Sequence, residues 1–377
     1  MALRTATCEG YKAFSAETRY GLGPLTVIFG RNNSGKTTLA RLPIYLVNAL
    51  SNESMYTLRA LGLSFGNSFA DLASPEQAHP RISVELSWDE SLIGVTMQQV
   101  SSPDAQTRVV AVGLRVGGVD YNIELAGLPV GIGSAIDLHL PEQVALKLRS
   151  AQDDLRAIAT SMLHIPSARP QIDDVYSMRE PQGWLTTEVP YLLAADRSLA
   201  ADVANWMDDA LQVGSVAVDS AAFAFRLTAR ERQTTINLAS AGRGTQAALP
   251  VATLLMAIAT ERLKCSAVVV EEPEAHLHPS AHGALADLIV KASANAQIII
   301  ETHSENLILR LRRHVAEKTF SSTNLMLHYV DADHLLSQIE IDEFGGAPAW
   351  PSGVFESDIL EAQAIMEAKL QAISRQG

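Results

Sequence analysis

Gly30-Arg31-Asn32-Asn33-Ser34-Gly35-Lys36-Thr37 is the stretch that decides the fold. It spells G-x-x-x-x-G-K-T between a strand-like apolar run at 25–29 and a helix-like run from Thr37 to about Leu50. A strand, a glycine-rich loop and a helix in this order form a phosphate-binding loop. The glycines let successive backbone N–H groups point at an anion, and the helix N-terminus adds a favourable field.

The residues of this loop have distinct predicted roles. Lys36 is expected to reach the β- and γ-phosphates of ATP, and the Thr37 hydroxyl to hold Mg²⁺. The predicted nucleotide contacts are Gly30, Arg31, Asn32, Asn33, Ser34, Gly35, Lys36, Thr37 and Thr38. A chance glycine-rich turn is the alternative, but it does not account for the flanking strand and helix.

The composition describes a chain with a sizeable core. Its 377 residues are 47% hydrophobic and 19% charged, enough for two or three domains or one large head with an insertion. No apolar run is long enough to suggest a membrane span, and the first ten residues lack the apolar region of a secretory signal. Cys8 and Cys265 lie far apart, so we expect structural cysteines in a reduced, cytoplasmic setting.

The charge balance is acidic. A formal net charge of −13 disfavours a surface built for non-specific nucleic-acid binding, which needs clustered Lys and Arg. A local basic patch is still possible, and Arg310, Arg312 and Arg313 form one candidate on a predicted helix. A solvated helix face is the favoured interpretation of these three residues.

The middle of the chain is mixed in character. Short alternating apolar runs at 81–125 indicate antiparallel strands. We expect helices at 141–164 and 198–212, an irregular connection at 165–190, and strands at 222–238.

The C-terminal half alternates between helices and buried strands. Ser266–Val270 and 296–300 are apolar without alternation, as parallel sheets require. Helix-like runs at 244–264, 279–294 and 305–317 surround them. This β-α-β-α order predicts a parallel sheet flanked by helices.

Two carboxylates end the first of these strands. Glu271 is placed to hold Mg²⁺, directly or through water, although the usual residue there is the shorter Asp. Glu272 is placed to orient and deprotonate a water that attacks the γ-phosphate. An acidic turn that merely caps the strand is the alternative.

Two further motifs follow the same logic. His303 ends the second buried strand, where it can hydrogen-bond the γ-phosphate and act as a switch; a structural histidine is the alternative. Ser240, Gly242 and Gly244 open a helix as a second anion-binding N-terminus, which in a dimer can cover the ATP of the other subunit. A glycine-rich helix start without a ligand is the alternative.

Taken in order, GRNNSGKT, SAGRG, VVVEEPEAHLHP and ETHS resemble the ABC-type ATPase heads of the SMC, RecF and OLD families. The sequence is most similar to compact bacterial AAA-family ATPases grouped with OLD-type proteins. Members of that group carry a small C-terminal domain ending in W-P-x-G-x-F, which matches Trp350 to Phe355. The resemblance is strongest at 24–50 and 236–305 and weak at 85–235.

The resemblance implies an α/β fold: a P-loop NTPase head of ABC/SMC type with a mixed central sheet flanked by helices, an antiparallel β lobe and a helical insertion. The expected segments are the N-terminal part of the head (1–80), the β lobe (81–130), the insertion or lid (131–221), the C-terminal part of the head (222–330) and a small C-terminal extension (331–377).

The resemblance also implies a mechanism. Two heads would dimerise around two ATP molecules, with Lys36, Thr37 and Glu271 at nucleotide and metal, Glu272 catalytic, and His303 as the switch. A glutamine should bridge the metal and the β lobe, and Gln77 is a possible match, with Gln98 and Gln99 as competitors.

The resemblance finally suggests an ATPase engine or sensor for a partner effector. The effector would be a nuclease or a toxin-like protein, in bacterial anti-phage defence, with a homodimer or a higher even-numbered oligomer as the assembly. No heptad run predicts an SMC-like arm, and the chain after His303 is too short for a nuclease domain, so Asp331 and Asp333 are interpreted as turn residues. A RecF-like repair ATPase that binds DNA, a slow ATP-dependent scaffold and a transporter subunit remain alternatives.

Overall fold

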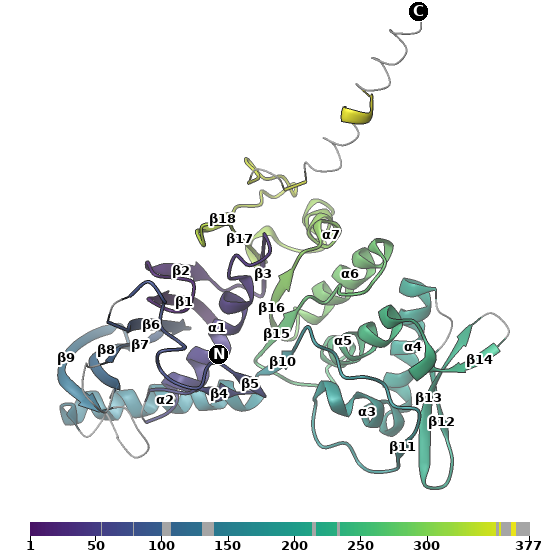
Figure 1. Ribbon diagram of the computed structural model, residues 1–377, viewed down its shortest axis with the longest axis horizontal. Helices are drawn as coiled ribbons and strands as arrows, with labels where there is room; N and C mark the ends of the chain where they lie inside the picture. Colours follow the sequence, from purple (N-terminus) through teal and green to yellow (C-terminus); the bar gives the residue numbers. More distant parts are fainter. Residues whose placement is uncertain are drawn as a thin grey trace, which may run out of the picture.

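The computed structural model describes residues 1–53, 55–77, 79–99, 107–129, 139–212, 216–231, 234–351, 354–355 and 363–366. A six-stranded central sheet divides the molecule (Figure 1). Its strands, in spatial order, are β10 (Leu163–Ile165), β15 (Ala267–Glu271), β16 (Gln297–Thr302), β3 (Leu25–Gly30), β17 (Leu325–Val330) and β18 (Leu336–Ile339).

The sheet is mixed, as the family resemblance implied. The first five strands run parallel, and β18 pairs antiparallel with β17. The predicted helix at 141–164 ends earlier, at Ser161, and the next residues form the edge strand β10. Three residues are too few for a periodic pattern, which explains why the sequence did not reveal this strand.

Burial on both faces makes the central strands apolar without alternation. Val269 and Ile299 pack on the face that carries helix α1 (Lys36–Leu50), whereas Val270 and Ile300 pack on the opposite face. Successive side chains of a strand point to opposite faces, so an uninterrupted apolar run supplies both cores.

Helices cover the two faces of this sheet (Figure 1). Helix α1 contacts β3, β15 and β16, and α2 (Glu142–Ser161) packs beside it. The opposite face carries α5 (Arg243–Ala259), α6 (His282–Ala292) and α7 (Glu305–Ala316). The β-α-β-α order of the C-terminal half therefore builds the predicted helix-flanked sheet.

The antiparallel lobe is a second six-stranded sheet. Its order is β2 (Thr18–Gly21), β1 (Leu3–Glu9), β6 (Arg81–Trp88), β7 (Ser91–Gln99), β8 (Thr107–Val116) and β9 (Val119–Pro129). One face of β6 is buried at every second residue, against α1 and the rest of the lobe. The chain's first two strands join this lobe rather than the central sheet, because β1 pairs with both β2 and β6.

A third region projects on the far side of the central sheet (Figure 1). Helices α3 (Val189–Ala195) and α4 (Arg197–Leu211) pack against α5. Beside them β13 (Ala224–Glu231) pairs with β11 (Tyr176–Ser177), β12 (Val216–Ser220) and β14 (Thr234–Asn237). Helices α3 and α4 lie within the range 131–221 that was expected to form the insertion, but α2 and β10 of that range belong to the head, and the third region continues through β13 and β14 to Asn237.

Short elements connect these parts. They are β4 (Arg59–Ala60), β5 (Leu63–Ser64), η2 (Thr186–Glu188), η3 (Leu238–Ser240), η4 (Pro279–Ala281) and η5 (Ser322–Asn324). Asp331 accepts hydrogen bonds from the backbone N–H groups of Asp333 and Leu335 in the turn between β17 and β18. This confirms the interpretation of the two aspartates as turn residues.

Two global features bear on the sequence expectations. Within the described residues, no helix is both long and apolar enough to cross a bilayer. Both cysteines are free, and burial raises the pKa of the Cys8 thiol to about 12 and that of Cys265 to about 11. A thiol that stays protonated is a poor nucleophile, which fits a structural role.

The central sheet gives a direct stability prediction. Ile299→Ala should lower the free energy of unfolding by roughly 2–5 kcal/mol, because it leaves a cavity between β16 and α1. Urea denaturation followed by circular dichroism measures the change. Leu146→Ala on the exposed side of α2 is the control and should change stability by less than about 0.5 kcal/mol. Equal losses in the two variants would contradict this packing.

Candidate nucleotide-binding site

The phosphate loop leaves β3 at Gly30 and enters α1 at Lys36. Gly30, Asn33 and Gly35 have φ values of 145°, 61° and 96°, in the left-handed half of backbone space. A Cβ on Gly30 would lie 2.1 Å from the carbonyl oxygen of Val330 in β17. Glycine at position 30 is thus required both by the backbone angle and by the close approach of the neighbouring strand.

Lys36 lies inside this loop. Its side chain is nearly buried, and Nζ donates a hydrogen bond to the carbonyl oxygen of Arg31 at 2.5 Å. Burial lowers the pKa of the ammonium, and the negative charges of Glu301 and Glu272 oppose this shift. The Oγ of Ser34 is buried without a hydrogen-bond partner in the described part of the chain. An ammonium and an unpaired hydroxyl in one loop fit the oxygens of a phosphate.

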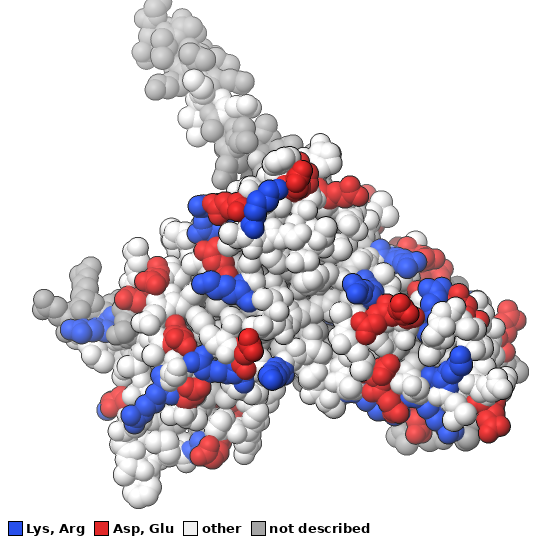
Figure 2. Space-filling model, turned by 180° about the vertical axis from the view of Figure 1, so that it is seen from behind, with Lys and Arg blue, Asp and Glu red and all other residues white. Residues whose placement is uncertain are grey.

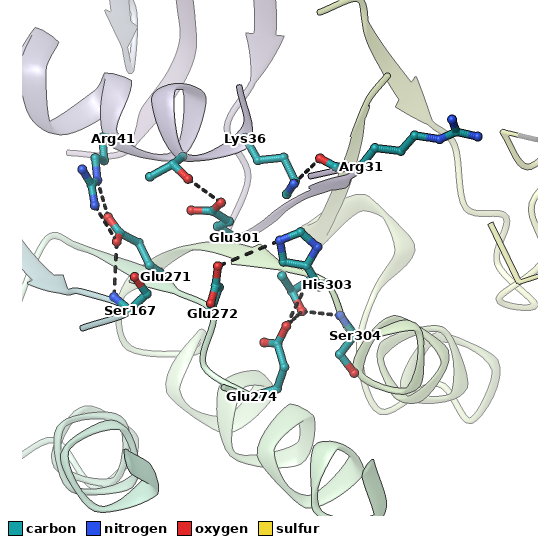
Figure 3. Close-up of polar contacts among 12 residues, drawn as sticks. Arg31, Lys36, Arg41, Ser167, Glu271, Glu272, Glu274, Glu301, His303 and Ser304 are labelled. Atoms are coloured by element: carbon teal, nitrogen blue, oxygen red, sulfur yellow. Dashed lines mark hydrogen bonds and ion pairs between the residues drawn. The ribbon is translucent and has the colours of Figure 1, made fainter. Parts of the chain in front are cut away.

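The start of α1 is fastened to the ends of two parallel strands. The Thr37 hydroxyl donates to Oε1 of Glu301, the fifth residue of β16, at 2.6 Å. One helical turn later, Arg41 Nη2 donates to Oε2 of Glu271, the last residue of β15, at 2.8 Å. These bonds bring together segments more than two hundred residues apart (Figure 3).

Glu272 follows β15 in a strained turn. Its φ of 41° is uncommon for a residue with a side chain, and such angles cost about 1–3 kcal/mol and cluster at functional sites. Its backbone N–H donates to the carbonyl oxygen of Glu301 at 2.8 Å. The turn sends the half-exposed carboxylate toward the His303 ring, with 3.9 Å between Oε1 and Nε2 (Figure 3).

His303 is positioned through its own backbone. Its N–H donates to Oε1 of Glu274 at 2.7 Å, and the same oxygen accepts from the Thr302 hydroxyl. Burial, and then the charge of Lys36, lower the pKa of the imidazole, while Glu272 and Glu274 oppose them. The imidazole is therefore mainly neutral at pH 7 and can donate one hydrogen bond and accept another.

Glu271 occupies a different environment from its neighbour Glu272. Besides Arg41, its carboxylate receives His164 Nε2 at 2.8 Å and the backbone N–H of Ser167 at 3.2 Å. Burial alone would raise its pKa, but the hydrogen bonds from Arg41 and His164 lower it to about 2. Both oxygens are thus engaged by protein groups, so a metal-binding role for Glu271 would have to displace them.

A partly buried arginine contacts the backbone of this turn. Arg169 Nη2 donates to the carbonyl oxygens of Glu271 and Glu272 at 2.8 and 3.3 Å. Burial lowers the pKa of this guanidinium to about 10, although the three nearby glutamates oppose the shift. No sequence pattern pointed to this contact, because Arg169 lies in the segment expected to be an irregular connection.

Oxygen and nitrogen ligands converge at this edge of the sheet. Single ligand atoms of Glu272, Glu301 and His303 all lie within 4.8 Å of one another. Thr37 adds a hydroxyl beside Glu301. Carboxylates and hydroxyls are the ligands that Mg²⁺ prefers, so the residues present fit the metal that a nucleotide would bring. Burial raises the pKa of Glu301 to about 7; the Thr37 hydrogen bond lowers it, and the charge of Glu271 raises it.

The second glycine motif lies on another part of the surface. Gly242 caps α5, and a Cβ on Gly244 would lie 2.6 Å from the carbonyl oxygen of His276. Gln246 holds the preceding loop by donating to the carbonyl oxygens of Ala239 and Ala241. A cavity of about 500 Å³ opens there; its lining includes Gly242, Gly244, Thr245, His276 and His278 and contains no residue of the phosphate loop. Ser240 ends the η3 turn just before it.

Several predicted site residues are thus brought together and others are not. Lys36, Glu272 and His303 share one region (Figure 3), and Thr37 joins them through its hydrogen bond to Glu301. Gln77 accepts a hydrogen bond from the backbone N–H of Arg81, so its metal-bridging role stays a prediction.

Gln98 in β7 is paired with Arg81 in the adjacent strand β6, and the backbone N–H of Gln99 donates to the Pro80 carbonyl oxygen. Both competing glutamines therefore lie near Gln77, which contacts Arg81. In the W-P-x-G-x-F motif, Ser352 and Gly353 lie outside the described residues.

The residues that sequence reasoning missed are Arg41, His164, Arg169, Glu274 and Glu301. Thr37 and Arg41 are four residues apart on one helix, a spacing that could have revealed their common face. Glu301 interrupts an apolar strand two residues before His303, which is a visible signal. The contact of His164 with Glu271 could not be predicted, because His164 lies in β10, a strand that the sequence analysis did not find.

Comparisons with known proteins concern the family and the fold. A family described as "AAA domain, putative AbiEii toxin, Type IV TA system" matches residues 133–310, somewhat less than half of the chain. The match includes the paired glutamates and the glycine motif before α5, but not the phosphate loop. No curated protein matches the chain.

Solved structures show the fold. The crystal structure of the Smc head bound to the C-terminal winged-helix domain of ScpA is similar with a TM-score of 0.54 at 13% identity, covering 91% of this chain and 99% of that one. The SMC head domain from Thermotoga maritima has a TM-score of 0.45 at 13% identity, covering 91% and 100%. The chain has the P-loop NTPase fold of SMC heads, and with the family match this supports an ATPase domain of ABC/AAA type.

The contacts of Glu271 predict a pH-dependent contribution to stability. Its pKa of about 2 lies below the ordinary value of 4.5, so the contribution is present above pH 4.5 and is lost as pH falls toward 2. Glu271→Gln should lower the free energy of unfolding by about 3 kcal/mol at pH 7. The difference in the free energy of unfolding between wild type and Glu271→Gln should shrink below pH 4.5.

Urea denaturation at a series of pH values measures this gap. The exposed Glu53→Gln is the control, and it should follow wild type at every pH. A Glu271→Gln variant as stable as wild type at pH 7 would show that the carboxylate is not held as described.

Proposed function

We propose that the protein binds ATP with Mg²⁺ and hydrolyses it to ADP and phosphate. The observation that carries this proposal is the contact between Thr37 and Glu301, which places the phosphate loop beside the strand ends that carry Glu272 and His303. A phosphate-binding lysine and a half-exposed carboxylate on a strained turn then face one space (Figure 3). These are the two groups that hydrolysis of a γ-phosphate requires.

The chain's own residues support each part of the reaction. Lys36 and the loop N–H groups bind the β- and γ-phosphates and offset their charge. Glu272 accepts a proton from water as the water oxygen bonds to the γ-phosphorus and the bond to the β–γ bridging oxygen breaks. His303, mainly neutral, donates a hydrogen bond to the γ-phosphate. Bound Mg²⁺ would neutralise further phosphate charge, with Thr37 among its ligands.

We also propose a dimer that closes over two nucleotides. The cavity at Gly242 and Gly244 contains no residue of the phosphate loop, so these glycines do not share a cavity with Lys36 in one chain. A helix N-terminus flanked by glycines binds anions, and α5 is long enough for a strong terminal field. A second copy that brings this terminus onto the γ-phosphate would complete the site.

In this arrangement, a conformational change caused by hydrolysis can reach the C-terminal segment. Helix α7 begins two residues after His303 and is capped by the Ser304 hydroxyl. The same helix holds the C-terminal motif, because the Arg312 guanidinium lies 4.9 Å from the centre of the Trp350 ring. The backbone N–H of Phe355 donates to Glu305. A shift of His303 on loss of the γ-phosphate would therefore move the surface around Trp350.

The partner proposed for this surface is an effector protein of nuclease or toxin type, in bacterial anti-phage defence and in the cytoplasm. Two findings support a protein partner. The description of the matched family names a putative toxin of a toxin–antitoxin system. The structure of the similar Smc head was solved with a domain of ScpA bound.

Direct DNA binding is the less favoured function. Arg310 pairs with Asp287, Arg313 pairs with Glu317, and Arg312 donates to the Gly345 carbonyl oxygen. The three arginines of the candidate basic patch therefore already have partners within the protein. The face in Figure 2 mixes basic and acidic side chains, whereas phosphate contacts need clustered cations.

Removal of the loop lysine tests nucleotide binding. Lys36→Ala should weaken ATP binding at least tenfold, because it deletes the charge that meets the phosphates. Fluorescence titration with a labelled ATP analogue measures the affinity. Lys318→Ala, which removes an exposed ammonium from the turn after α7, is the control. Unchanged affinity in Lys36→Ala would contradict the assignment of the phosphate loop.

Replacement of the proposed base tests hydrolysis. Glu272→Gln should release phosphate at least a hundredfold more slowly, yet bind ATP as well as wild type and form more dimer with ATP. Phosphate release and sedimentation velocity measure the two effects. Equal and negligible release by wild type and Glu272→Gln would instead support a slow scaffold that holds ATP.

A further inference from the structure

Two neighbouring carboxylates point at the same helix. Glu271 in β15 and Glu301 in β16 are direct partners in the register of the parallel sheet. Thr37 and Arg41 lie one turn apart on α1. Thr37 donates a hydrogen bond to Glu301, and Arg41 donates to Glu271. Parallel strands in register place these two side chains on one face of the sheet. Which carboxylate is neutralised therefore depends on which residue of α1 contacts it.

The helix neutralises only one of the two. Glu271 receives the Arg41 guanidinium and the His164 ring and is 1% exposed. Glu301 is almost as buried, at 3%, but its side-chain partner in the described part of the chain is the uncharged Thr37 hydroxyl. A buried carboxylate without a cation at hydrogen-bond distance is costly, and a bound triphosphate beside it would add to the cost.

The position of Glu301 offers a way to remove this cost. Thr37 Oγ1, in contact with Glu301 Oε1 at 2.6 Å, is the hydroxyl that directly follows the phosphate-binding lysine. Glu272 and His303 supply further ligand atoms within 4.8 Å of Glu301. Mg²⁺ binds through one or two protein oxygens together with phosphate oxygens and water, which this group can provide.

We propose that Glu301, together with Thr37, supplies the protein ligands for the metal of the bound nucleotide, and that Glu271 instead holds α1 against β15. This inference rests on the proposed binding of ATP at the phosphate loop. It assigns the metal to the strand that carries His303, rather than to the strand that carries the paired glutamates. Glu271 then acts as a positioning residue through Arg41.

A neutral role for Glu301 is the competing explanation. A protonated acid would accept the Thr37 hydrogen bond through its carbonyl oxygen and need no cation. Glutamine has nearly the same shape as a protonated glutamic acid, so Glu301→Gln keeps the neutral role and loses the metal ligand. The variant therefore separates the two explanations.

The test measures the gain in nucleotide affinity that a metal provides. The full chain is titrated with a fluorescent, non-hydrolysable ATP analogue, once with Mn²⁺ and once with EDTA. The ratio of the two dissociation constants reports metal binding without any turnover. In Glu301→Gln this ratio should fall at least tenfold, the range found when groups at metal sites are removed. Affinity in EDTA should be unchanged or tighter, because a negative charge near the phosphates is gone.

Matched variants make the result specific. Glu271→Gln should keep the larger part of the ratio, because a displaced α1 would weaken analogue binding in Mn²⁺ and in EDTA alike. Glu188→Gln removes another buried carboxylate, which pairs with Arg179 away from this site, and should keep the full ratio. Glu301→Asp retains a carboxylate and should recover part of the ratio; it also serves if Glu301→Gln does not fold, as circular dichroism would show.

The opposite pattern would overturn the assignment. A full ratio in Glu301→Gln would support the neutral role of Glu301. Loss of the ratio in Glu271→Gln alone would return the metal to Glu271. Phosphate release by wild type is measured in parallel. If wild type shows a metal-dependent gain through Glu301 but releases no phosphate, the proposed hydrolysis is contradicted and the metal assignment is supported.

Discussion

The whole site depends on one helical turn that is bound to the ends of two parallel strands. Thr37 and Arg41 leave the same side of α1 and contact Glu301 and Glu271, which lie side by side in β16 and β15. These bonds fix the phosphate loop against the C-terminal half of the chain. The pairing of β3 with β16 and of β16 with β15 brings Lys36 and Glu272 to the same edge of the sheet, and these side-chain bonds set the position of the loop there.

The electrostatics of this contact explain why two adjacent glutamates behave differently. Arg41 and His164 lower the pKa of Glu271 to about 2, whereas burial raises that of Glu301 to about 7. A permanent cation serves one carboxylate, and the other faces the phosphate loop. Pairs of acids whose environments move their pKa values apart commonly divide structural and functional roles.

The sequence revealed those parts of the fold and site that depend on local patterns. The phosphate loop needs only a contiguous strand, loop and helix, and β15 and β16 are long enough to show double-sided burial. β10 stayed hidden because it has three residues. The bonds of Arg41, His164 and Arg169 stayed hidden because they form only when distant segments meet, and no local period records such a pairing.

The structure of the protein with a non-hydrolysable ATP analogue and Mn²⁺ is the most direct test of the central claim that one chain's two halves grip the triphosphate and a second copy closes over it. We expect a γ-phosphate between Lys36 of one copy and the Gly242–Gly244 loop of the other, with the metal located by its anomalous signal beside Thr37 and Glu301. A triphosphate bound away from Lys36, or a site complete within a single chain, would contradict it.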